Sequence, residues 1–391
     1  MGSPHGRFDP RVGAGCVAVF PVHGQVCRWD HCRGDEGVNR VTSDRPASPR
    51  IVRLTGPIFS PGSHEVEQIA SRGWSLATVA GTSPDEIIPH VAEADIVSVV
   101  GTYIPATVID AMTRVRAIAR LGAGTDRIDV AHATSRGIVV MNTPYFCVEE
   151  QADHTMAMIL SLARKLPLAQ RAMEAGEYAK ARAASATNPR MSRTTLGLVG
   201  FGRSAVHTAR RARGFGMRVL ATRRNMSAPT EEADAIGVVM TDLDTILRES
   251  DFISLHLPLT RGSRHMIDAA ALARMKPSAY LINTSRGALV DELALVKALH
   301  DGQIAGAGLD TFAIIEVLDA SGPPDAHPLM HMDNVLLSPH VAAGSDRSAI
   351  DSVDAGIENI EAILGGFWPV PEHRVNAEVI PRVPLIDREA R

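Results

Sequence analysis

Several features that mark secreted, membrane or nucleic-acid-binding proteins are scarce in this sequence. Four cysteines in 391 residues do not make a disulfide framework, so a reducing cytoplasm is the expected location. No apolar run reaches the roughly 18 residues that suggest a membrane span. The formal net charge of −4 gives no electrostatic reason to expect nucleic acid or an anionic membrane as a partner.

A metal-binding pattern is also missing, although cysteines and histidines gather near the N-terminus. They are Cys16, His23, Cys27, His31 and Cys32. No C-x-x-C pair is present there and the spacing matches no zinc pattern, so no metal is predicted. Residues 1–48 are rich in Gly, Pro, Arg and Asp without an apolar period, and we interpret them as a poorly ordered extension.

The rest of the sequence has the composition and pattern of an α/β protein. Hydrophobic residues make up 45% and charged residues 21% of the chain, which is typical of soluble globular proteins. From residue 50 onward, short β-rich runs alternate with helical stretches, and this alternation predicts parallel sheets covered by helices. An apolar helix at 148–166, suited to burial against another element or another subunit, separates two such series.

The two series predict two Rossmann-like, doubly wound parallel-sheet domains with a cleft between them. The first domain comprises 49–148 together with 341–371, and the second comprises 149–340 with about six strands. The last stretch, 372–391, has prolines and mixed charge and is predicted to be a tail.

A glycine pattern opens the second domain. The stretch "LGLVGFGRSA" gives Gly200-x-Gly202-x-x-Ala205 between a strand and a helix. Gly200 permits a tight turn, Gly202 lets the backbone approach a pyrophosphate, and Ala205 lets the helix pack close to the strand. Phosphates bind at such a helix N-terminus through its free N–H groups and dipole. The sequence therefore predicts a dinucleotide site at Gly200, Phe201, Gly202, Arg203, Ser204 and Ala205.

Two arginines follow the second strand of this domain, in "VLATRRN" (219–225). Arg223 stands where proteins that hold the ribose of NAD have a carboxylate, which repels a 2′-phosphate. The planar fork of arginine suits phosphate instead. We therefore predict NADP(H) as the preferred cofactor, bound through Arg223 and Arg224, with Thr222 or Asn225 adding hydrogen bonds. The alternative is NAD(H) with both arginines on the surface.

Three further stretches follow strand ends and carry reactive side chains. "INTSRGALVDE" contains Arg286, "LLSPHVAAGS" contains His340, and "GLDTFAIIEVLD" contains Asp310 and Glu316. Ligands of an open α/β sheet bind beyond the carboxyl ends of its strands. An arginine, a histidine and a glutamate can therefore converge on the nicotinamide end of the cofactor.

These motifs resemble those of the D-isomer-specific 2-hydroxyacid dehydrogenases. The matching pieces occur in the family's order between residues 51 and 366: "RLGAGTDRIDV", "NTPYFCVEEQADH", "LGLVGFGRSA", "SLHLPLT", "INTSRGALVDE", "GLDTF" and "NVLLSPH". The "VEEQADH" piece resembles the branch that includes phosphoglycerate-dehydrogenase-like enzymes and the C-terminal-binding-protein corepressors. The resemblance implies a substrate-binding first domain, a nucleotide-binding second domain and a homodimer through the second domain, to which the apolar 156–162 stretch is suited.

The resemblance also implies a role for each site residue. Arg286 holds the substrate carboxylate or carbonyl, His340 exchanges a proton with the substrate oxygen, and a glutamate fixes the histidine tautomer. Backbone N–H groups of two loops bind the substrate carboxylate, at Gly101, Thr102, Gly122 and Ala123. The remaining cofactor contacts are His256, Pro258, Thr284, Asp310 and His340.

Two departures from the family pattern matter. The family's catalytic glutamate stands where this chain has Ile315, and Glu316 lies one position later. Either the loop carries an extra residue and Glu316 still reaches His340, which we favour, or the glutamate is missing. The first substrate loop, "VVGTYIP" (99–105), has no basic residue, which argues against 3-phosphoglycerate as substrate and favours a small uncharged or apolar substrate side chain.

The expected reaction is the reversible reduction of a small 2-keto acid, such as glyoxylate, hydroxypyruvate or a branched acid, with NADPH. Two alternatives stay open. One is an NAD-dependent D-3-phosphoglycerate dehydrogenase-like enzyme, and the other is a non-enzymatic, nucleotide-sensing binding protein like the corepressors.

Overall fold

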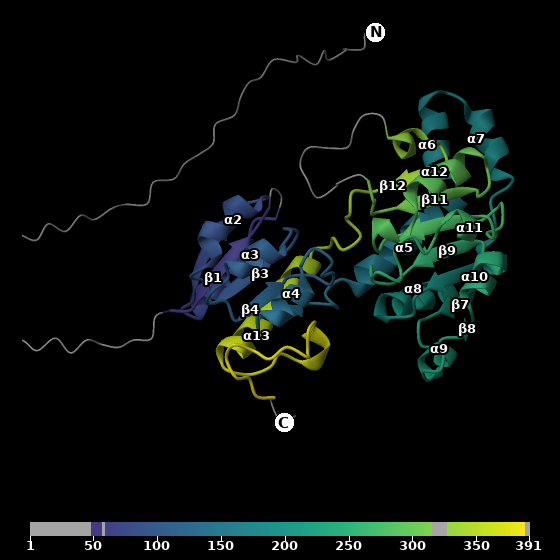
Figure 1. Ribbon diagram of the computed structural model, residues 1–391. Helices are drawn as coiled ribbons and strands as arrows, with labels where there is room; N and C mark the ends of the chain where they lie inside the picture. Colours follow the sequence, from purple (N-terminus) through teal and green to yellow (C-terminus); the bar gives the residue numbers. More distant parts are fainter. Residues whose placement is uncertain (1–47, 57–58, 315–326, 388–391) are drawn as a thin grey trace, which may run out of the picture. The chain divides into compact units, whose positions relative to one another are not determined.

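The computed structural model describes residues 48–56, 59–314 and 327–387, which contain two parallel sheets with helices on their faces (Figure 1). The extension predicted at 1–48 lies outside the described residues apart from Ser48, and so does Glu316. The described residues belong to one compact unit. Within them no helix is both long and apolar enough to cross a membrane, and no cluster of His, Cys, Asp or Glu is placed to hold a metal ion.

The first sheet has five parallel strands in the order β2-β1-β3-β4-β5. Its strands are β1 (Arg50–Leu54), β2 (Ser75–Val79), β3 (Ile96–Val99), β4 (Ala117–Arg120) and β5 (Val139–Asn142). Its helices are α1 (Ser63–Ser71), α2 (Pro84–Val91), α3 (Ala106–Asp110), α4 (Val130–Ser135) and, returning from the far end of the chain, α13 (Ser348–Leu364). The strands are almost continuously apolar because helices cover both faces of a parallel sheet.

The second sheet has seven parallel strands in the order β12-β11-β10-β9-β6-β7-β8. They are β6 (Thr195–Val199), β7 (Arg218–Thr222), β8 (Val238–Met240), β9 (Phe252–Leu255), β10 (Tyr280–Asn283), β11 (Gly306–Leu309) and β12 (Val335–Leu337). The strand order reverses between β6 and β9, which is the switch point where open α/β sheets bind ligands. The parallel, doubly wound sheets are as the sequence predicts, although the second has seven strands where about six were expected, and the predicted domain bounds stay a prediction.

Helices complete the second domain. They are α5 (Val148–Ala163), α6 (Leu166–Glu174), α7 (Tyr178–Ser185), α8 (Arg203–Gly214), α9 (Glu231–Ala235), α10 (Leu243–Glu249), α11 (Ala269–Leu272) and α12 (Glu292–His300), with 3₁₀ turns η1 (Met191–Arg193), η2 (Gly287–Leu289) and η3 (Pro328–His331). The helix predicted at 148–166 ends at Ala163 because Lys165 adopts a left-handed conformation, with φ 54°. The α5 residues Met156, Ile159 and Leu162 are buried in the domain's own core, against α8 and the sheet. Ala157 of the same stretch is exposed, and the subunit contact expected there, like the homodimer, stays a prediction.

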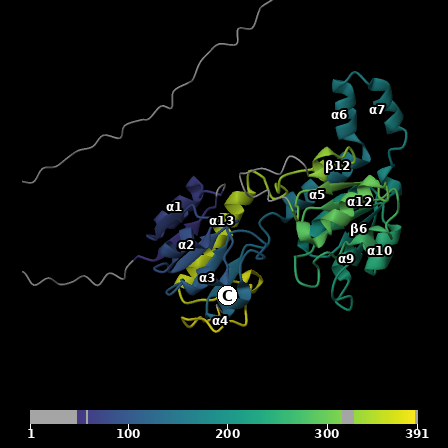
Figure 2. The same ribbon diagram turned by 45° about the horizontal axis from the view of Figure 1, so that its top comes forward.

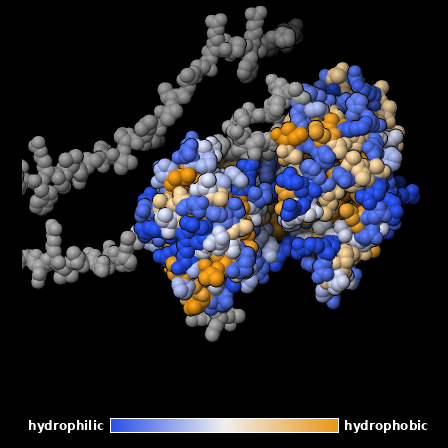
Figure 3. All heavy atoms as spheres, viewed as in Figure 1, coloured by the Kyte–Doolittle hydropathy of each residue, from blue (hydrophilic) through white to orange (hydrophobic). Residues whose placement is uncertain are grey.

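The C-terminal segment returns to the first domain after α13 and passes through η4 (Pro371–His373) (Figure 2). Asn376 is buried, and its Oδ1 accepts a hydrogen bond from the Val140 N–H at 2.7 Å. Its Nδ2 donates to the Ile138 carbonyl at 3.0 Å and to Thr134 Oγ1 at 2.9 Å. Residues 372–387, expected as part of a tail, therefore pack along the edge of β5. Hydrophobic residues gather on the surface of this segment in Figure 3, and Ile380 and Ile386 are among its exposed side chains.

Candidate functional site

The turn between β6 and α8 has the geometry of a phosphate-binding loop. Gly200 adopts φ 97°, and a Cβ atom there would lie 2.2 Å from the His256 carbonyl oxygen, so only glycine fits. Gly202 caps α8, and no atom lies within 4 Å of the position of a Cβ there, so this face of the backbone is open. Ala205 is fully buried in the first turn of α8. These residues fit a pyrophosphate at the helix N-terminus.

A neutral histidine supports this turn from β9. Burial lowers the pKa of His256 to about 4, so its ring carries no charge at neutral pH. One ring nitrogen lies 3.1 Å from Ser204 Oγ and the other lies 2.9 Å from Ser254 Oγ. Arg203 lies over the ring of Tyr145, with its guanidinium carbon 3.9 Å from the ring centroid. His256 thus ties the end of β9 to the start of α8, at the switch point.

The two arginines after β7 occupy different environments. Arg223 donates hydrogen bonds to the carbonyl oxygens of Ala228 and, at 2.8 Å, of Pro229, so it closes the loop in which it lies. Arg224 is exposed and has no side-chain partner among the described residues. The cofactor contacts predicted for both residues, for Thr222 and for the neighbouring Asn225 remain predictions.

Arg286 lies at the carboxyl end of β10. Its Nε donates to Asp126 Oδ1 at 2.9 Å and its Nη1 donates to the Ser285 carbonyl at 2.7 Å. Desolvation raises the pKa of Asp126, but the charge and hydrogen bond of Arg286, a backbone hydrogen bond and the charge of Arg120 together bring this pKa below its usual value. Two residues before Arg286, the Thr284 hydroxyl lies 3.1 Å from the Thr155 hydroxyl, and this contact joins the end of β10 to α5. Arg286 is therefore a fixed cation that links the two domains.

His340 lies on the turn after β12, in the left-handed region at φ 56°. The backbone N–H of His340 donates to the backbone carbonyl of Asp310 at 2.8 Å. The Asp310 carboxylate is fully buried and accepts hydrogen bonds from Ser338 Oγ at 2.6 Å, Val341 N at 2.9 Å and Ala342 N at 3.0 Å. Asp310 thus shapes the turn that presents His340, and its predicted cofactor contact stays a prediction. Ser338, which sequence reasoning missed, joins the same network.

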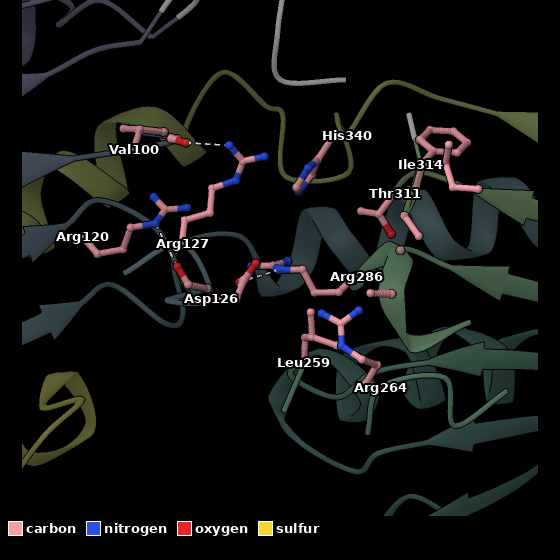
Figure 4. A pocket seen from close by; sticks show the side chains of 16 residues that line it. Val100, Arg120, Asp126, Arg127, Leu259, Arg264, Arg286, Thr311, Ile314 and His340 are labelled. Carbon is pink, nitrogen blue, oxygen red and sulfur yellow. Dashed lines mark hydrogen bonds and ion pairs between the residues drawn. The ribbon is translucent and has the colours of Figure 1, made fainter. Parts of the chain in front are cut away.

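One cavity of about 300 Å³ brings Arg286 and His340 together (Figure 4). Its lining comes from both domains: Val100, Gly101, Arg120, Gly124, Asp126, Arg127, Leu259, Arg264, Arg286, Gly287, Ala288, Thr311, Phe312, Ala313, Ile314 and His340. Of the residues predicted to bind substrate, Gly101 and Arg286 line this cavity, whereas Thr102, Gly122 and Ala123 do not. Sequence reasoning missed Arg120, Arg127 and Arg264, although the first two lie inside a quoted motif.

The surroundings of His340 are strongly cationic. Desolvation and the charge of Arg286 lower its pKa below the usual value, while Asp310 acts in the opposite direction. Among the described residues no carboxylate forms a hydrogen bond with the His340 ring. The role predicted for Glu316 falls on an undescribed residue and stays a prediction.

A buried contact between a glutamate and a histidine lies behind one wall of the cavity. Glu292, at the start of α12, and His327 are both buried, and Glu292 Oε1 lies 2.9 Å from His327 Nε2. The other carboxylate oxygen accepts a hydrogen bond from Ala313 N at 2.6 Å. Because Phe312, Ala313 and Ile314 line the cavity, Glu292 fixes part of its shape. Only the acidic start of the helix after "RGALVD" could have pointed to Glu292 in the sequence.

Comparisons with known proteins agree with this geometry. A family model described as "D-isomer specific 2-hydroxyacid dehydrogenase, NAD binding domain" matches residues 156–342. A glyoxylate reductase from Korarchaeum cryptofilum is 40% identical over 308 residues, which cover 77% of this chain and 88% of the relative. A D-3-phosphoglycerate dehydrogenase from Methanocaldococcus jannaschii is 32% identical over 85% of this chain and 61% of its own length.

Solved structures show the same likeness. An NADPH-dependent glyoxylate/hydroxypyruvate reductase from Sinorhizobium meliloti, in complex with citrate, superimposes with a TM-score of 0.69 at 28% identity, over 86% of this chain and 99% of that one. Sequence identity to these relatives thus extends along most of the chain. It accompanies the two doubly wound sheets, the phosphate-binding turn, and the arginine and histidine that line one cavity. The chain belongs to the D-isomer-specific 2-hydroxyacid dehydrogenase family, whose members are NAD(P)-dependent oxidoreductases that act on CH–OH groups.

Proposed function

We propose that the chain is an NADPH-preferring reductase of short 2-keto acids of the glyoxylate and hydroxypyruvate type. The observation that carries this proposal is that Arg286 and His340 line one cavity at the carboxyl ends of the second sheet's strands. The names of relatives support it, since several are glyoxylate reductases.

A dinucleotide held at the turn from Gly200 to Ala205 would supply the hydride that the keto carbon of the substrate needs. Arg286 holds the substrate carboxylate, and the N–H groups near Gly101 complete the contact. The His340 imidazolium gives its proton to the keto oxygen, so that keto acid, NADPH and one proton become the D-2-hydroxy acid and NADP⁺. Glu316 is proposed to hold the other ring nitrogen of His340. The lowered pKa of His340 makes its imidazolium a ready proton donor.

The preference for NADPH is proposed on the charges beyond β7. No acidic residue lies between Thr222 and Thr230, and the Arg224 guanidinium is exposed without a partner among the described residues. Arg223 orders the loop through the Ala228 and Pro229 carbonyls, while Arg224 is free to contact a 2′-phosphate. This division of roles refines the expectation that both arginines bind the phosphate directly.

The test is a titration of the purified protein with NADPH and NADH, followed by rates with glyoxylate and hydroxypyruvate. We expect NADPH to bind at least about tenfold more tightly, and Arg224→Gln to remove most of that advantage without weakening NADH. Arg218→Gln is the matched control, because Arg218 is an exposed arginine at the other end of β7.

Equal binding of NADH and NADPH would show that the NADP preference is wrong. If NADPH binds but neither acid reacts with any dinucleotide, the reductase proposal fails and a nucleotide-sensing binding protein becomes the better interpretation.

A further inference from the structure

The turn that carries His340 is strained and depends on one neighbouring residue. A non-glycine residue keeps the left-handed conformation of His340 only when its surroundings enforce it. The backbone N–H of His340 donates to the Asp310 carbonyl at 2.8 Å. The next two backbone N–H groups, of Val341 and Ala342, donate to the Asp310 carboxylate at 2.9 and 3.0 Å. The orientation of the His340 side chain therefore depends on the position of Asp310.

Asp310 is a fully buried carboxylate, so its position depends on its own partners. Removing a carboxylate from water is costly unless hydrogen bonds or an opposite charge compensate. The shortest of its hydrogen bonds comes from Ser338 Oγ, 2.6 Å from Oδ1. His154 Nε2 lies 3.6 Å from the same carboxylate oxygen. Two side chains, one after β12 and one on α5, thus support the carboxylate in addition to the backbone N–H groups.

The hydrogen bonds in this group have a defined direction. An ionised carboxylate only accepts hydrogen bonds, so the single proton of the Ser338 hydroxyl points to Asp310. The Ser338 oxygen is therefore the acceptor in its 2.9 Å contact with His154 Nε2, and this ring nitrogen carries a proton. Hydrogen bonds that run in one direction, from His154 through Ser338 to Asp310, polarise and strengthen one another.

His154 is a partly buried side chain on α5 that the proposed reaction does not use. Its exposed fraction is 25%, and within the described part of the chain its ring contacts Ser338 and Asp310. Its backbone is fixed, because α5 packs against β10 and β11 and the neighbouring Thr155 hydroxyl contacts Thr284. What the imidazole adds at this place is an N–H donor directed at the Ser338 hydroxyl.

Resting on the proposed reductase function, we propose that His154 is a positioning residue for the reaction: through Ser338 it holds the Asp310 carboxylate, and thereby the turn that presents His340 to the substrate. His154 does not touch the reacting atoms. Its loss therefore affects the proton transfer by His340, which sets kcat, and not the binding of the substrate carboxylate, which Arg286 provides.

The experiment compares two substitutions of His154 in the full chain, with NADPH and glyoxylate. His154→Leu removes the N–H donor and keeps an apolar side chain in its place, whereas His154→Gln keeps an N–H donor. Rates are expressed per NADPH-binding site, counted by fluorescence titration. We expect His154→Leu to lower kcat about tenfold with KM for glyoxylate within about twofold, and His154→Gln to recover kcat to within about threefold of the parent.

A second pair of variants tests whether His154 acts through Ser338. Ser338→Ala should lower kcat at least as much as His154→Leu, because it removes the hydrogen bond to Asp310 directly. Adding His154→Leu to Ser338→Ala should slow the reaction by less than about twofold more, since residues in one chain of contacts do not add independently. A further tenfold loss in the double variant would overturn the inference.

His207→Leu is the matched control. His207 lies on the adjacent helix α8, the exposed fraction of its side chain is 26%, and its ring lies 4.0 Å from Glu149. It should leave kcat within about twofold. The inference is wrong if His154→Leu keeps the parent kcat or changes KM alone. It is also wrong if His154→Gln is as slow as His154→Leu, because the shape of the ring and not its N–H donor would then matter.

Hydrogen exchange separates this inference from the proposed reaction, because it needs no turnover. In the peptide that spans 338–345, His154→Leu should speed exchange of the backbone N–H groups that bind Asp310 about tenfold, while β6 keeps its protection. If no keto acid reacts but this exchange rises, the hydrogen-bonded group holds the turn while the reductase function fails. Unchanged exchange in this peptide would overturn the inference whether or not a keto acid reacts.

Discussion

His256 is a histidine that burial keeps neutral, and this has a consequence for stability. Its pKa is about 4 in the folded protein and near its ordinary value of 6.5 in the unfolded chain. The unfolded state therefore binds the proton more readily between these values. The contribution of neutral His256 to the free energy of unfolding is therefore complete above pH 6.5. It is lost as the pH falls towards 4, by roughly 3 kcal/mol in all.

We expect His256→Gln to flatten the decline of the free energy of unfolding between pH 6.5 and 4, measured by urea denaturation at a series of pH values. His300→Gln is the control, because His300 is exposed at the end of α12 and its loss should leave the curve parallel to that of the parent protein. A His256→Gln curve that falls as steeply as the parent's would contradict this account of His256.

Single site residues differ in how far the sequence reveals them. Arg286 and His340 are predictable because each directly follows a strand in a recognisable stretch, and the fold then brings strand ends together. Arg120 and Arg264 are not predictable in this way. Their position in the cavity depends on how loops from different domains meet, which no local pattern encodes.

Among the elements, the turn from β6 to α8 offers the sharpest test, because its two glycines have different physical roles. Gly200→Ala would place a methyl group against the His256 carbonyl at a positive φ, so we expect it to lower the free energy of unfolding by about 2–4 kcal/mol and to abolish NADPH binding. Gly202→Ala meets no neighbour and no strain, so the fold should lose less than about 1 kcal/mol.

The Gly202→Ala methyl group should nevertheless weaken NADPH about tenfold or more, since it stands where the pyrophosphate approaches the backbone. Urea denaturation and fluorescence titration of both variants measure the two effects separately. Unchanged NADPH affinity in Gly202→Ala would mean that the phosphates do not bind at this turn.

The elements themselves were largely predictable, but two strands at sheet edges, β2 and β8, were not recognised in the sequence. Long apolar runs such as β6 and β10 are read easily, because a parallel strand buried on both faces is continuously hydrophobic. Strand β8 has only three residues, one of them exposed, and lies at the edge of the sheet, so its pattern is too short to detect. The contacts of Glu292 with His327 and with Ala313 N likewise could not be predicted, because the three residues come from separate segments of the sequence.

For the molecule as a whole, the course of the C-terminal segment was the feature least evident from sequence. Prolines and mixed charge suggested a tail. Instead, the Asn376 side chain forms hydrogen bonds with the Val140 N–H and the Ile138 carbonyl at the edge of β5, where another strand would otherwise pair. Backbone groups at a sheet edge need hydrogen-bond partners, and a side-chain amide supplies both a donor and an acceptor. The first domain is therefore assembled from both ends of the described chain.

We expect Asn376→Ala to destabilise this domain by on the order of 3 kcal/mol, because it removes three hydrogen bonds and leaves the Val140 N–H and the Ile138 carbonyl buried without their partner. Urea denaturation measures the loss, and NADPH affinity at low denaturant should stay unchanged because the second domain is untouched. Glu378→Ala, at an exposed position on the same segment, should change stability by less than about 0.5 kcal/mol. If Asn376→Ala is as stable as Glu378→Ala, the segment does not hold the edge of β5 in solution, and residues 372–387 act as the tail that their composition suggests.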